Sequence, residues 1–203
     1  MNSRQWFDQA SAGLKALLPG LAEQLDSPAL GTWSIRSLLG HTSRAFTTVD
    51  SYLAFSPIDD SQIDLDSPAA YYKMASASLA DPVQVAERGR KAGLALGRDP
   101  LAATQSIIET VLSLVDSAED EYEVATPLGS MKLGDYLPTR AFEVTVHSID
   151  LAVASGQAIP TEILECIVPS LDLATRFATS DQQLQLLLSV TGRKPLPSGF
   201  TIL

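Results

Sequence analysis

The sequence is poor in the residues that most often carry out chemistry in proteins. Its 203 residues include one cysteine, Cys166, and two histidines, His41 and His147. A single cysteine excludes a disulfide within the chain, as is usual in a reducing compartment. Cys166 lies in an apolar helical stretch, so we interpret it as a small core residue. The sequence offers no convincing Cys–His or Ser–His–Asp arrangement that would supply a nucleophile.

Basic residues and long apolar runs are also scarce. Fourteen Lys and Arg stand against 24 Asp and Glu, which gives a net charge of −10. Nucleic acids and anionic membrane surfaces attract a cationic patch, and none is visible, so we predict neither as a partner. No apolar run approaches the roughly 20 residues that span a bilayer. The first residues are polar and charged, so we expect no signal peptide and a cytoplasmic location.

Hydrophobic residues make up 45 % of the chain and recur mostly at helical spacing. The pattern predicts an all-α, antiparallel helical bundle over residues 1–195 with an irregular tail, 196–203. Residues 119–133 predict a small hairpin or an extended loop, the only short β element expected. We expect a loop over 56–67, and helices over 3–25 (interrupted at Pro19-Gly20), 34–53, 68–79, 82–97, 100–118, 135–154 (with Pro138 in its first turn), 160–178 and 180–192.

The helix predicted over 135–154 is apolar around most of its circumference but carries one polar stripe. At about 100° per residue, Arg140, Glu143, His147 and Asp150 fall in a single sector. A solvated face is one interpretation, although an exposed stripe usually contains lysine and this one does not. The other is a buried polar site. There Glu143 and His147 bind a divalent metal, Asp150 orients a ligand or a water, and Arg140 pairs with a substrate carboxylate.

His41 decides between these interpretations. It lies at the rim of the apolar stripe of its own helix, where either a half-exposed histidine or a ligand at the edge of a core would lie. If the two helices pack together, His41, Glu143 and His147 supply three protein ligands and leave a fourth position open, as in catalytic zinc sites. Two nitrogens and one carboxylate suit zinc, nickel, iron or manganese.

Three segments resemble one family of metalloproteins. Residues 33–41 read WSIRSLLGH, residues 140–152 read RAFEVTVHSIDLA, and residues 187–193 read LLSVTGR. The first is similar to a segment of DinB-like metalloproteins, and the second to the mycothiol-dependent maleylpyruvate isomerase branch. The resemblance spans residues from about 5 to 195. It implies a DinB-like four-helix bundle with additional helices, and His41, Glu143 and His147 as ligands of a metal, usually zinc and sometimes nickel.

The resemblance also implies a cosubstrate, a low-molecular-weight thiol such as mycothiol. We therefore expect a metal-dependent transferase or isomerase. It would carry out S-transfer to a small electrophilic substrate, or cis-trans isomerisation of one, with Asp150 and Arg140 as candidate catalytic residues. Two alternatives stay open: a metal-assisted hydrolase that works without thiol, and a non-catalytic protein that binds a metal or a small ligand. An exposed apolar face near residues 160–190 would allow a homodimer.

Overall fold

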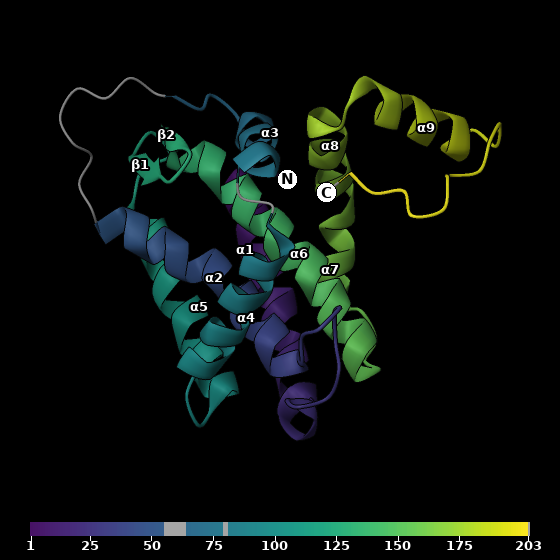
Figure 1. The fold of residues 1–203 in the computed structure, drawn as a ribbon. Coiled ribbons are helices and arrows are strands. Elements are labelled where there is room, and N and C mark those ends of the chain that lie inside the picture. Colours follow the sequence, from purple (N-terminus) through teal and green to yellow (C-terminus); the bar gives the residue numbers. More distant parts are fainter. Residues whose placement is uncertain (55–63, 79–80, 203) are drawn as a thin grey trace.

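The computed structural model describes residues 1–54, 64–78 and 81–202, so most of the loop predicted over 56–67 lies outside the described residues. Within the described part, helices dominate and one two-stranded sheet is present, which confirms the predicted all-α class with a short β element (Figure 1). The elements are α1 (Ser3–Leu17), the 3₁₀ helix η1 (Leu18–Gln24), α2 (Ile35–Ala54), α3 (Pro68–Ser78), α4 (Pro82–Ala95), α5 (Pro100–Ser117), β1 (Glu123–Thr126), β2 (Gly129–Lys132), α6 (Leu133–Ser155), α7 (Thr161–Glu165), α8 (Ile167–Phe177) and α9 (Ser180–Val190).

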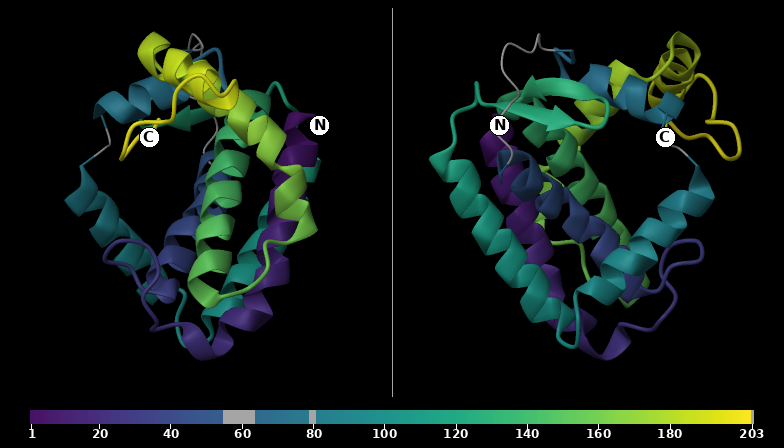
Figure 2. Two further views of the ribbon diagram at one scale, coloured as in Figure 1. Left: turned by 90° about the vertical axis from the view of Figure 1, so that its right-hand side faces the viewer. Right: turned by 60° about the vertical axis from the view of Figure 1, so that its left-hand side comes forward.

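Four long helices, α1, α2, α5 and α6, lie side by side and enclose the core (Figure 2). Helix α6 is central, because it packs against both α1 and α2. The rings of Phe7 and Phe46, both fully buried, lie 5.3 Å apart where α1 and α2 meet in this core. An apolar stripe on each helix accounts for the arrangement, since each stripe must be buried against its neighbours. Because α2 packs against α6, the polar side chains on the facing sides of these two helices lie near each other.

The two strands form an antiparallel hairpin that leads directly into α6. Glu123 pairs with Lys132, and Thr126 pairs with Gly129. Helix α6 begins at Leu133, immediately after β2, so the hairpin fixes its start. We expected the helix to begin near Asp135 with Pro138 in its first turn, but Pro138 lies in the second turn.

The helix predicted over 160–178 is divided in two. Helix α7 ends at Glu165 and α8 starts at Ile167, with Cys166 between them. Pro169 explains the division, because a proline ring clashes with the carbonyl four residues earlier, here that of Glu165.

Glycines allow α4 to lie unusually close to α2. A Cβ atom at Gly40 would overlap the backbone of Gly93, and one at Gly93 would lie 2.6 Å from the Arg36 carbonyl oxygen. One turn earlier on α4, a Cβ at Gly89 would lie 2.6 Å from the Trp33 ring. The close approach brings the α4 side chains up to the segment that carries His41.

Helix α9 extends away from the bundle at one end (Figure 1). None of its residues is fully buried, and Leu184, Leu187 and Val190 are exposed together with Leu171 of α8. This apolar surface lies in the region near residues 160–190 where an exposed apolar face would allow a homodimer, and the homodimer stays a prediction. Among the described residues, no helix combines the length and apolar character needed to cross a membrane.

Candidate metal centre

Helices α2 and α6 bring the three predicted ligands to one place. His41 comes from α2, and Glu143 and His147 come from successive turns of α6. One potential ligand atom from each side chain can be chosen so that all three atoms lie within 4.8 Å of one another. Among the described residues, these three form the one group of histidine, cysteine and carboxylate side chains that lie close enough together to hold a metal ion.

The two imidazole rings and the carboxylate converge on a common point. His147 Nε2 lies 3.5 Å from Glu143 Oε2, and the centres of the His41 and His147 rings are 4.8 Å apart in an edge-on arrangement. His41 Nδ1 is buried and has no hydrogen-bond partner among the described residues. A buried polar atom without a partner is costly, and a coordinated ion in the site would relieve that cost by engaging the ring. The donor set and this unpaired nitrogen both fit a divalent cation.

Asp150 lies on the far side of His147. Its Oδ2 is 3.0 Å from His147 Nδ1, so with that nitrogen protonated the imidazole donates to the carboxylate. The lone pair is then left on Nε2, the nitrogen that faces Glu143. Metal-binding histidines typically have such a partner, which fixes the tautomer and the orientation of the ring. The structure thus places Asp150 behind a candidate ligand, where it is suited to position His147.

Tyr72 is a site residue that the sequence did not reveal. Its hydroxyl lies 2.9 Å from Glu143 Oε1 and 3.0 Å from the Thr139 carbonyl oxygen, and it donates its single proton to these acceptors. The ring is buried and stacks on Phe177 at 4.6 Å. Tyr72 therefore holds one oxygen of Glu143 and leaves Oε2 toward His147. No local pattern predicts a contact between residues 71 positions apart in the sequence.

The three candidate ligands shift one another's pKa values. Burial lowers the pKa of His41 to about 4, helped by the neighbouring charges of His147, Arg44 and Arg88. Burial alone would also lower the pKa of His147, but hydrogen bonds to Asp150 and Glu143 raise it to about 9. Burial would raise the pKa of Glu143, yet His147 and Arg140 bring it down to about 2. These shifts show that the surroundings favour a positive charge between His147 Nε2 and Glu143. In the metal-bound protein, the cation would take the place of the proton on Nε2.

Arg140 lies one turn before Glu143 but is not part of the triad. Its side chain is buried, and its guanidinium carbon lies 4.9 Å from the centre of the Tyr136 ring and 5.3 Å from that of Tyr71. It borders a cavity of about 180 Å³ that is also lined by His41 and Glu143. The location agrees with the predicted contact to a substrate, which stays a prediction.

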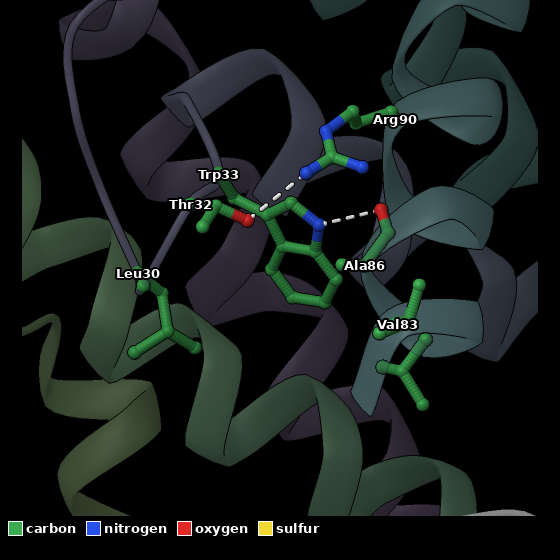
Figure 3. Close-up of a pocket in the computed structure, with 8 residues that line it drawn as sticks. Leu30, Thr32, Trp33, Val83, Ala86 and Arg90 are labelled. Carbon is green, nitrogen blue, oxygen red and sulfur yellow. Dashed lines mark hydrogen bonds between the residues drawn. The ribbon is translucent and has the colours of Figure 1, made fainter. Parts of the chain in front are cut away.

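A larger apolar pocket of about 590 Å³ is lined by the loop around Trp33 and the start of α4 (Figure 3). The indole N–H of Trp33 donates to the Ala86 carbonyl at 2.8 Å, and Arg90 donates to Thr32 at 3.1 Å. None of the three candidate ligands lines this pocket. The Trp33 ring also lies 4.6 Å from the ring of His41, so it separates the pocket from the triad.

We expect the substitution Asp150→Asn to weaken zinc binding by roughly 10- to 100-fold, because the amide no longer holds His147 in the tautomer that presents Nε2. The measurement is a competition titration against a chromophoric chelator. Asp172→Asn on α8 is the matched control, since Asp172 pairs only with the exposed Arg176 among the described residues. An Asp150→Asn protein with the zinc affinity of the control would remove the positioning role.

Comparison with known proteins agrees with this geometry. The family model of the mycothiol maleylpyruvate isomerase N-terminal domain matches residues 7–152, a range that contains His41, Glu143 and His147. Searches of curated proteins and of solved structures gave no significant match. The family match covers well over half of the chain, includes both helices of the triad and supports the resemblance seen in the sequence. This chain belongs to the mycothiol maleylpyruvate isomerase N-terminal domain family.

Proposed function

We propose that the protein is a divalent-metal-dependent enzyme that uses a low-molecular-weight thiol of the mycothiol type. It would transfer the thiol to a small electrophilic substrate or use it to catalyse a cis-trans isomerisation. The observation that carries the proposal is the convergence of His41, Glu143 and His147, with ligand atoms within 4.8 Å of one another. Zinc is the expected metal, and nickel is the second candidate.

In this proposal the cation is held by His41, Glu143 and His147. Burial lowers the pKa of His41, and neighbouring side chains orient the other two ligands. A cation bound there supplies the positive charge that lowers the pKa of a thiol brought next to it. Asp150 keeps His147 Nδ1 protonated, and Tyr72 holds Glu143 Oε1. Because Glu143 serves as a ligand, it is not assigned the role of general base.

The thiol must come from outside the chain. Cys166 is the only cysteine, its side chain is fully buried, and burial raises the pKa of its thiol to about 11. A buried thiol with a raised pKa is a poor nucleophile. A thiol cosubstrate would also place the protein in the cytoplasm, where thiols are kept reduced.

The test is the thiol dependence of two reactions catalysed by the zinc-loaded protein. Transfer is followed with 1-chloro-2,4-dinitrobenzene, in which a C–S bond forms, chloride leaves and the thiol proton goes to solvent. Isomerisation is followed by NMR with maleate, to which the thiol adds and from which it is eliminated after rotation. We expect mycothiol to support at least one reaction at a rate clearly above the protein-free rate, because a thiol next to a bound cation loses its proton more readily.

Metal and variant controls complete this test. Removal of zinc with a chelator, or the substitution His147→Ala, should return the rate to background, whereas Asp172→Asn should not change it. Consumption of an ester at the same rate with and without thiol would identify a hydrolase. Background rates with mycothiol, bacillithiol and glutathione alike would leave a binding protein and contradict the proposal.

A further inference from the structure

Tyr72 connects a candidate metal ligand to the aromatic side chains at α8. It lies on α3, which packs against both α6 and α8. Its ring stacks on Phe177 of α8 at an angle of 26° and lies edge-on to Phe142 of α6 at 5.3 Å. Only 4 % of the residue is exposed. These neighbours leave the hydroxyl little freedom to move away from Glu143, to which it donates.

The two oxygens of the Glu143 carboxylate have different neighbours. Oε1 accepts from Tyr72 at 2.9 Å, while Oε2 lies 3.5 Å from His147 Nε2. The Tyr72 hydroxyl has a second acceptor, the Thr139 carbonyl oxygen at 3.0 Å, but a carboxylate is the stronger acceptor because it is charged. No lysine or arginine of the described residues forms an ion pair with Glu143. Tyr72 is therefore the donor that distinguishes one oxygen from the other.

A carboxylate can bind a metal ion through one oxygen or through both. If Glu143 used both, it would supply four ligand atoms together with the two histidines, and the protein would fill a tetrahedral site. If Glu143 used one, a fourth position would stay open, as it does in catalytic zinc sites. An oxygen that accepts a hydrogen bond has a lone pair engaged and competes less well for a cation, so the partners of a ligand tune how it binds.

We propose that Tyr72 is a positioning residue that confines Glu143 to binding the metal through Oε2 alone and so keeps one coordination position open. The inference rests on the proposed function, in which a thiol is brought next to the metal, and adds the side chain that controls access to it. Tyr72 acts through Glu143 and touches neither the thiol nor the metal. The substitution Tyr72→Phe removes the hydroxyl and keeps the ring against Phe177, so Oε1 becomes free to join the coordination.

The experiment uses the full chain loaded with cobalt(II) in place of zinc. The geometry around a metal follows the number and type of its ligands. Four-coordinate cobalt(II) absorbs strongly in the visible, and each further ligand weakens the band. We expect the wild type to absorb strongly and Tyr72→Phe to lose absorption per bound cobalt severalfold. A residue that only packs against its neighbours would not change this spectrum.

Tyr122→Phe is the matched control, because it removes another tyrosine hydroxyl, one that donates to the Leu53 carbonyl oxygen at 3.3 Å. It should keep the wild-type spectrum, and circular dichroism should show the same helix content in every variant. Phe177→Leu is a second variant, since it removes the ring that holds Tyr72 but leaves the hydroxyl in place. It should weaken the visible band in the same direction as Tyr72→Phe.

Addition of mycothiol separates this inference from the proposed function. A thiol that binds cobalt loses its proton to solvent, and the thiolate gives a charge-transfer band in the near ultraviolet. We expect this band in the wild type and a weaker one in Tyr72→Phe at equal cobalt occupancy. Wild-type spectra in Tyr72→Phe and Phe177→Leu would overturn the inference, even if the thiolate band supported the proposed function. A weakened visible band in Tyr72→Phe, with no thiolate band in the wild type, would support the positioning role and contradict the proposed function. A wild-type protein that bound no cobalt would overturn both.

Discussion

The substitution His147→Ala should reduce zinc affinity by about 100- to 1000-fold. Four-ligand structural zinc sites contribute about 10–16 kcal/mol, or about 2.5–4 kcal/mol for each ligand, and each 1.4 kcal/mol is a factor of ten. His147 is central to the site, because it faces Glu143 through Nε2 and is oriented by Asp150 through Nδ1. The loss is expected to exceed that of Asp150→Asn, which leaves all three ligands in place.

The measurement is a zinc competition titration of the wild type and the variant at one pH. Circular dichroism should show that the variant keeps its helices, since His147 is a site residue and not part of the apolar core. Asp172→Asn is again the control and should bind zinc like the wild type. Retention of wild-type zinc affinity in His147→Ala would count against the whole candidate centre.

The substitution Gly40→Ala should destabilise the protein by about 1–3 kcal/mol, because the added methyl group overlaps the α4 backbone at Gly93. This cost outweighs the gain of about 1 kcal/mol that alanine brings to a helix interior. For a chain of this length the expected fall in melting temperature is about 2–4 °C for each kcal/mol. Thermal unfolding and urea titration of the metal-free protein measure the effect.

Gly134→Ala is the matched control, because it makes the same change in α6. A Cβ at Gly134 would lie 3.1 Å from the Cβ of Asp120, whose side chain is 58 % exposed, so a shift of a few tenths of an ångström relieves the contact. We expect this variant to stay within about 1 kcal/mol of the wild type. If Gly40→Ala proved as stable as Gly134→Ala, the close approach of α2 and α4 would not be required for the fold.

The sequence predicted the bundle and its helices well, for a physical reason. Apolar residues at helical spacing determine which face of a helix is buried, and Asp81, Asp99 and their following prolines mark two helix starts. Pairing of Glu143 with His147 was also predictable, since residues four apart on a helix share a face. The position of His41 beside them depended on the packing of α2 against α6, which the sequence could only suggest.

Other features depend on contacts that no local pattern contains. Tyr72 reaches Glu143 from α3, and Arg88 reaches the cavity because the glycines on α4 permit close packing with α2. The division of the helix at Cys166 was visible in principle, since Pro169 lies within the predicted helix. Three arginines that line one cavity come from positions 44, 88 and 140, so only the folded chain brings them together.

The most direct test of the metal centre is an anomalous difference map at the zinc edge from crystals of the zinc-loaded protein. We predict one strong peak at about 2.0–2.2 Å from a ring nitrogen of His41, from His147 Nε2 and from Glu143 Oε2. A zinc peak bound elsewhere on the molecule, with no density between these three side chains, would contradict the account.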